Sequence, residues 1–92
     1  MTEMEKLIKL LEEEKIPFET TECWGAPQVC YPSSNGRVCD AVCHSFSYGH
    51  ERGLLEIMGL VDEEEIGDSV EGYLTAEDVF ERIKNHFILY NF

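Results

Sequence analysis

Most of the side chains capable of chemistry lie in one stretch, residues 37–53, which reads RVCDAVCHSFSYGHERG. It holds two of the four cysteines and two of the three histidines, together with Arg37 and Arg52. These residue types serve metal centres, cysteine nucleophiles with an imidazole base, and pockets for anions. The secondary structure of this stretch decides which of the three is feasible.

A zinc site needs thiol or imidazole ligands that converge on one point. The available ligands are Cys23, Cys30, Cys39, Cys43, His44, His50 and His86, without the paired spacing of structural zinc sites. The pattern of residues 37–48 favours a strand, which would place Cys39 and Cys43 about 13 Å apart. Two thiolates on one zinc ion lie within about 4 Å, so the strand predicts no metal and no cofactor. A short helix over about residues 38–46 fits the same spacing and would reopen the metal question.

Cysteine catalysis meets a similar obstacle. Cys43 and His44 are neighbours, so on a strand they point to opposite faces. Asp40 and His44 share a face but lie about 13 Å apart. No nucleophile elbow, phosphate loop or paired-carboxylate pattern is present. We therefore predict a binding protein rather than an enzyme, with a cysteine- or metal-dependent enzyme as an alternative.

An anion pocket is the third chemistry. The polar and aromatic side chains of the expected hairpin are Arg37, Asp40, His44, Tyr48, His50 and Arg52. A symmetric register would bring the two arginines together, and arginine forks bind phosphate or carboxylate. This pattern predicts a site for a small anionic, nucleotide-like ligand. The alternative is that the arginines pair with nearby acids such as Glu51 and Glu56.

The charge balance points to a different kind of partner. Nineteen acidic residues face seven basic ones, which gives a net charge of -12. Such a surface repels nucleic acids and anionic membranes and favours basic proteins. Acids such as Glu63, Glu64 and Glu65 can imitate a run of phosphates and block a nucleic-acid-binding protein, or they only keep the chain soluble. Trp24, the sole tryptophan, either caps the core or is an exposed partner contact.

Local signals predict the elements that must position these residues. A helix is expected over residues 2–15 with Thr2 as its cap, and a second begins at Thr75 with Asp78 at the third helical position. Strands are expected over residues 16–23, 28–32, 37–48 and 54–61. Trp24 to Pro27 reads as a turn, Asn35-Gly36 as a type I′ hairpin turn, and residues 62–72 as an acidic loop.

These elements predict one domain, residues 1–92, of the α+β class. We expect an N-terminal helix, an antiparallel meander of about four short strands and a C-terminal helix, with both helices on one face of the sheet. The N-terminus lacks the apolar core of a signal peptide, which predicts a cytoplasmic protein. The final ILYNF is apolar and either docks on the domain or forms a contact in a homo-oligomer.

Two segments resemble a group of small proteins. DSVEGYLTAEDVFERIKNHF and RVCDAVCHSFSYGHERGLLEIMG are similar to segments of uncharacterised proteins from phages and prophages of Gram-positive bacteria. Small accessory phage proteins often antagonise bacterial defences by plugging a nuclease, by mimicking DNA or by sequestering a nucleotide signal. The resemblance therefore implies a counter-defence role inside an infected bacterium and carries no assigned site residue.

Overall fold

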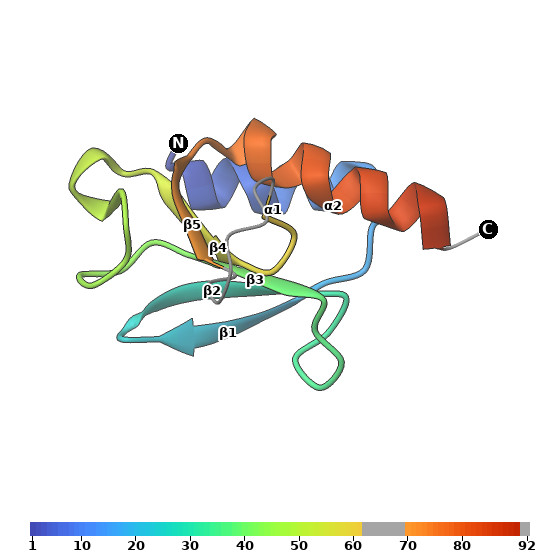
Figure 1. The fold of residues 1–92 in the computed structure, drawn as a ribbon, viewed down its shortest axis with the longest axis horizontal. Coiled ribbons are helices and arrows are strands. Elements are labelled where there is room, and N and C mark those ends of the chain that lie inside the picture. The colour runs from blue at the N-terminus through green and yellow to red at the C-terminus, as the bar shows by residue number, and fades with distance from the viewer. Residues whose placement is uncertain (62–69, 91–92) are drawn as a thin grey trace.

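The computed structural model describes residues 1–61 and 70–90 and has the predicted α+β architecture. Its elements are α1 (Glu3–Glu13), β1 (Glu19–Cys23), β2 (Ala26–Tyr31), β3 (Cys39–Val42), the 3₁₀ turn η1 (His50–Arg52), β4 (Leu55–Met58), β5 (Val70–Leu74) and α2 (Ala76–Tyr90). The strands form an antiparallel meander in sequence order, and both helices lie on one face of the sheet (Figure 1). The sheet has five strands rather than about four, because β5 takes up part of the expected acidic loop.

Both ends of α1 are closed by local hydrogen bonds. Thr2 Oγ1 accepts from the Glu5 N–H at 3.1 Å, and Glu5 Oε1 accepts from the Thr2 N–H at 2.9 Å. At the other end Lys15 adopts a left-handed φ of 56°, and the Ile16 N–H bonds the Leu11 carbonyl at 3.0 Å. This Schellman-type ending stops the helix at Glu13, before Pro17.

The start of α2 is capped as predicted and is also tied to α1. The Asp78 N–H donates to Thr75 Oγ1 at 3.2 Å, while the Thr75 N–H donates to Asp78 Oδ2 at 3.0 Å. Glu3 Oε1 accepts from the Ala76 N–H at 2.8 Å, and Lys6 Nζ lies 2.9 Å from Glu3 Oε2. A carboxylate from the first helix thus satisfies an unpaired amide at the start of the second.

The tightest hairpin lies at a different place from the one that the sequence favoured. Trp24 and Gly25 form the two-residue turn between β1 and β2, with φ values of 53° and 75°, as a type I′ turn requires. Asn35 and Gly36 do not have positive φ and belong to a longer connection between Tyr31 and Cys39. The turn expected at Trp24 is confirmed, whereas the type I′ turn expected at Asn35-Gly36 is wrong.

The strand expected over residues 37–48 is much shorter. The observed strand is Cys39–Val42, of which residues 40–42 pair with both neighbours and Cys39 with β2, and all four residues are buried. The chain then turns at once, because Ser47 Oγ accepts from the His44 N–H and donates to the His44 carbonyl, both at 2.9 Å. The alternative helix over residues 38–46 is also absent.

One core joins the sheet to both helices. Leu7 and Leu11 of α1 and Val79 and Ile83 of α2 are buried against apolar residues of the central strands, including Leu55. The end of α2 does not pack in this way. Leu89 and Tyr90 continue the helix but remain 69% and 72% exposed, so of the two alternatives for the tail, docking on the domain does not apply to these two residues. The homo-oligomer contact stays a prediction, and residues 91–92 lie outside the described residues.

No helix in the described parts of the chain is long and apolar enough to cross a bilayer.

Replacing Glu3 with alanine should destabilise the protein by about 1–2 kcal/mol, because the Ala76 N–H loses its charged acceptor. The hydrogen bonds from Ala76 and Lys6 hold the pKa of Glu3 below its ordinary value of 4.5. The stabilisation is therefore present above that value and lost as the pH falls through the folded-state pKa. Urea unfolding of wild type and Glu3→Ala across this pH range measures it. Glu12→Ala, an exposed change on the same helix, is the control.

Candidate functional site

The six residues of the expected anion pocket do not come together. Arg37 lies before β3, where its Nη1 is 3.3 Å from Asp40 Oδ2 and its Nε donates to the Ser34 carbonyl at 3.4 Å. Asp40 is 8% exposed, so Arg37 partly neutralises a buried carboxylate. This arginine therefore pairs with an acid of its own segment, although not with Glu51 or Glu56.

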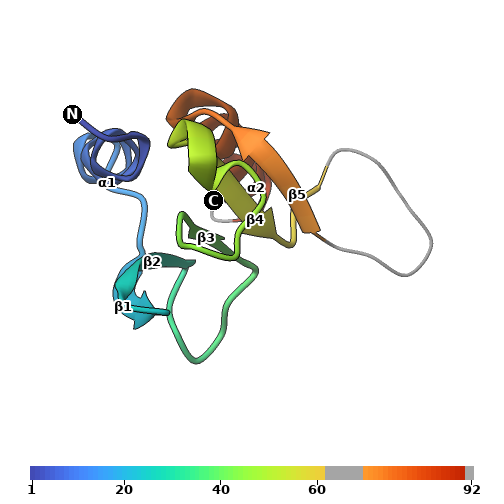
Figure 2. The ribbon, with the colours of Figure 1, turned by 90° about the vertical axis from the view of Figure 1, so that its left-hand side faces the viewer.

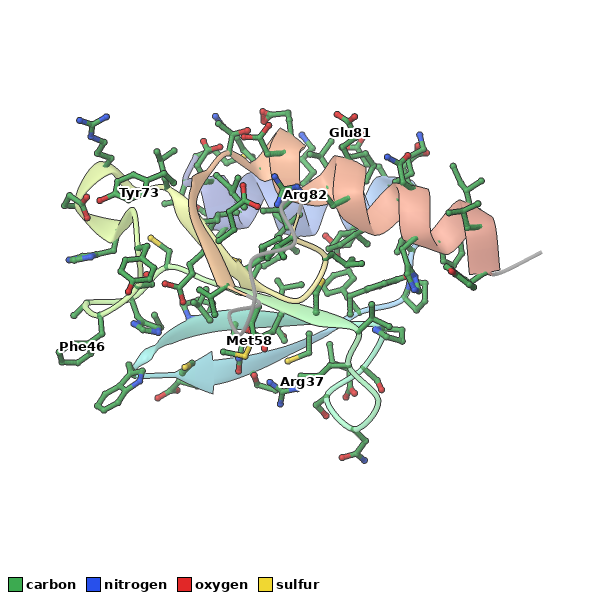
Figure 3. All side chains as sticks on the ribbon, viewed as in Figure 1. Arg37, Phe46, Met58, Tyr73, Glu81 and Arg82 are labelled. Carbon is green, nitrogen blue, oxygen red and sulfur yellow. The ribbon has the colours of Figure 1, made fainter. Side chains whose placement is uncertain are left out.

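The other four residues lie beyond the opposite end of β3. Asp40 pairs with Met58 and Val42 with Glu56, so Arg37 and the segment 43–54 lie off opposite ends of the same ladder. Figure 3 shows Arg37 and Phe46 well apart in this way. The expected closeness of Arg37 and Arg52 is wrong, because the short strand leaves no symmetric hairpin to join them.

Within the segment 43–54, local bonds occupy the side chains of two predicted ligand residues. His50 Nδ1 lies 3.0 Å from the Ser47 carbonyl oxygen, and His44 Nδ1 accepts from the Phe46 N–H at 3.1 Å. The four residues concerned are His44, Tyr48, His50 and Arg52. They belong to the connection between β3 and β4, which contains the turn closed by Ser47.

The four cysteines are free thiols, and burial disfavours ionisation of two of them, Cys39 and Cys43. Cys39 is 2% exposed, and its desolvation raises the pKa of the thiol to about 12. Burial also raises the pKa of Cys43. Both shifts oppose formation of the nucleophilic thiolate. Across residues 1–61 and 70–90, no group of three or more potential ligands is placed to hold a metal ion.

Three rings do converge, and they form an aromatic cluster of Trp24, His44 and Phe46. The Trp24 and Phe46 ring centroids lie 4.9 Å apart in an edge-to-face arrangement, and His44 lies 6.4 Å from each. Trp24 and Phe46 are each 71% exposed. Edge-to-face packing fixes the rings relative to one another while their surface remains open to solvent.

Backbone geometry holds this aromatic cluster in place. Trp24 occupies a left-handed position of its tight turn, which most side chains avoid. The Phe46 N–H donates to His44 Nδ1 at 3.1 Å, and Ser47, which closes the same turn, is 3% exposed. The exposed rings therefore stand on ordered turns.

The connection 43–54 is also fastened to β5. The Tyr73 N–H donates to the Tyr48 carbonyl at 3.2 Å, and Tyr73 Oη donates to Glu51 Oε1 at 2.6 Å. Gly72 passes directly beneath Tyr48, where a Cβ would overlap the Tyr48 Cβ and lie 2.6 Å from its carbonyl oxygen. A glycine is required here by close approach.

A mostly apolar hollow of about 480 Å³ lies beside the residues that lead into the aromatic cluster. Its lining includes Met4, Glu5 and Ile8 of α1, Pro27 of β2 and Cys43. An aliphatic stem that ends in a positive charge matches this combination of surfaces.

Sequence reasoning found Trp24 but missed Phe46. The alternation of residues 37–48 placed Phe46 on a strand face with Val42, and no local signal revealed the turn between them. The exposure of Trp24 excludes the core-capping alternative. His86, considered above as a metal ligand, instead shares a hydrogen bond with the buried Tyr31 hydroxyl, with Nδ1 and Oη 2.8 Å apart. The predicted contacts Glu63, Glu64 and Glu65 lie outside the described residues.

No protein-family model, curated protein or solved structure matches the chain.

Replacing Gly72 with alanine should destabilise the protein by about 1–3 kcal/mol, because the new methyl group overlaps Tyr48. Thermal or urea unfolding measures the loss. Gly36→Ala is the matched control, since its Cβ would meet only Ser33 Oγ at 3.8 Å. Equal stability of the two variants would contradict the close packing of β5 against the connection.

Cys39 should resist alkylation in the folded protein at pH 8, because its pKa of about 12 leaves little thiolate. Iodoacetamide labelling followed by peptide mass spectrometry should show modification of Cys39 only after a denaturant is added. The partly exposed Cys23 is the internal reference. Equal rates at Cys39 and Cys23 without denaturant would show that the thiol is accessible and ionised.

Proposed function

We propose that this chain is a non-enzymatic binding protein that docks onto a basic, nucleic-acid-binding protein. The observation that carries the proposal is the aromatic cluster, in which Trp24 and Phe46 are both largely exposed yet held in ring contact. Tryptophan and other aromatic side chains are enriched among interface residues that dominate binding energy. A rigid aromatic anchor loses little conformational entropy when a partner covers it.

The strain at Trp24 supports a role in binding. A non-glycine residue at a φ of 53° costs about 1–2 kcal/mol, and the exposed ring recovers little of this through burial. Asparagine or glycine would suit the turn better. A side chain that costs stability and is 71% exposed is explained by a contact that forms outside the chain.

The net charge of -12 supports a basic partner. Opposite charge speeds association with a basic protein. The same negative charge repels nucleic acids and anionic membranes, which carry like charge. The apolar hollow beside the aromatic cluster, with Glu5 in its lining, suits a lysine or arginine side chain. The acidic surface thus complements the same class of partner as the aromatic anchor.

The anion-sequestering alternative has less support, because the predicted pocket residues are divided between the two ends of β3. A cysteine enzyme also has less support, because burial raises the pKa values of Cys39 and Cys43. The resemblance to small phage proteins makes a bacterial defence nuclease in the host cytoplasm the first class of partner to test.

Trp24→Asn should abolish partner binding while keeping or raising stability by up to about 1 kcal/mol, since asparagine tolerates the left-handed turn position. Affinity capture from a bacterial lysate, followed by mass spectrometry and binding of the purified candidate, measures the first effect. Wild type should retain a basic protein that Trp24→Asn and Phe46→Ala do not, with weaker binding at higher salt. Urea unfolding measures the second effect.

Leu89→Asn is the control, because Leu89 is 69% exposed and lies on the distant end of α2. It should bind as the wild type does. If Trp24→Asn and wild type retain the same proteins equally, the aromatic cluster is not the docking surface. A nucleotide adduct seen by native mass spectrometry and lost in Arg37→Ala would favour the anion-binding alternative instead.

A further inference from the structure

One edge of the sheet is open beside the aromatic cluster. β1 is the first strand in the sheet order, so only one of its sides is paired, and it runs directly into the turn that carries Trp24. Figure 2 shows β1 on the outside of the sheet. Of its residues, Glu19, Thr20 and Glu22 are exposed. We propose, resting on the proposed function, that the partner adds an extended segment bearing lysine or arginine to this edge as a further antiparallel or parallel strand.

The register identifies the backbone groups that such a segment would meet. In a two-residue hairpin the residues that flank the turn, Cys23 and Ala26, form a hydrogen-bonded pair. Hydrogen-bonded and non-bonded pairs alternate along an antiparallel ladder, so Thr21 also bonds to β2. The N–H and C=O groups of Thr20 and Glu22 therefore point outward, along the free edge.

Two observations agree with this assignment. Pro27 lies opposite Glu22 and has no N–H to donate, which suits a pair that is not hydrogen-bonded. Within residues 1–61 and 70–90, no other backbone hydrogen bond reaches the main chain of Thr20 or Glu22. These groups are open to an incoming strand.

The opposite edge of the sheet is not open in the same way. The Tyr73 N–H on β5 already donates to the Tyr48 carbonyl, and the connection 43–54 packs closely on Gly72. An incoming segment would have to displace this packing. Strand addition is therefore directed to β1 rather than to β5.

The acidic side chains of β1 indicate which kind of segment would pair with its open edge. β1 carries Glu19 and Glu22 and no basic residue, and Glu22 belongs to the non-hydrogen-bonded pair that lies one position before the turn-flanking pair. Pairing with a second copy of β1 would bring four glutamates onto two short adjacent strands, which is unfavourable. A segment bearing lysine or arginine gains attraction instead, and its next residues would reach the aromatic cluster. Main-chain bonds then provide affinity and the rings and charges provide specificity.

The test uses linear random peptides displayed on a carrier, selected on the wild-type chain. Enriched peptides should contain lysine or arginine, and synthetic copies should bind in solution. Thr20→Pro removes an outward N–H that β2 does not use and places a ring on the free edge. It should weaken peptide binding about tenfold or more. Thr20→Ala keeps the N–H and should bind as the wild type does.

Each outcome separates the strand-addition inference from the proposed function. If Thr20→Pro, shown by circular dichroism to be folded, binds the peptides as well as wild type, strand addition is wrong. The same holds if no linear peptide is enriched, or if methylating the peptide amides in turn never weakens binding. In those cases a basic protein whose capture still depends on Trp24 would leave the proposed function standing. Loss of dependence on Trp24 would overturn the proposed function itself.

If Thr20→Pro fails to fold, Thr20→Ala with the amide-methylated peptides decides the question without it. Weaker binding after methylation of alternate amides supports strand addition, and unchanged binding overturns it.

Discussion

The position of β3 between β2 and β4 is the constraint on which the rest of the structure depends. Its four residues are buried on both faces, and each neighbouring strand is aligned to it by a fixed register. A one-residue slip would turn Ala41, which faces the core, to the opposite side of the sheet. This short strand also separates the two connections that leave its ends, so it determines which side chains can meet.

Arg37 and Arg52 illustrate that consequence. They lie fifteen positions apart in the sequence, yet β3 sends them to opposite ends of the ladder, and Arg37 pairs with Asp40 instead. Trp24 and Phe46 are further apart in the sequence but come from connections at the same end of β3. The sheet thus brings two aromatic side chains together and separates two arginines. The residue types alone had favoured a site built around the arginines.

Features set by bonds within a few residues could be predicted from the sequence. The caps at Thr2 and Thr75 and the turn at Trp24 depend on neighbours close along the chain. The length of β3 could not be predicted in this way. Its end depends on the turn closed by Ser47, and the following connection rests on Gly72 of a strand that lies more than twenty residues later. The periodicity of apolar residues was enough to predict the order of the helices and the fold class. The aromatic cluster depends on packing between segments that are distant in the sequence, so it could not be predicted in this way.

Trp24 connects stability with binding. Its ring occupies a turn position that prefers asparagine or glycine, and the ring gains little burial within the chain. The neighbouring edge of β1 is also incomplete within the described part of the chain, because its outward backbone groups have no protein partner until another strand pairs with them. The two edges of the sheet differ: the connection 43–54 packs on Gly72 and accepts a hydrogen bond from Tyr73 of β5, while β1 stays open and bears acids that oppose self-pairing. An open acidic edge that ends at a strained, exposed tryptophan forms a continuous surface, and a basic extended segment satisfies both parts of it.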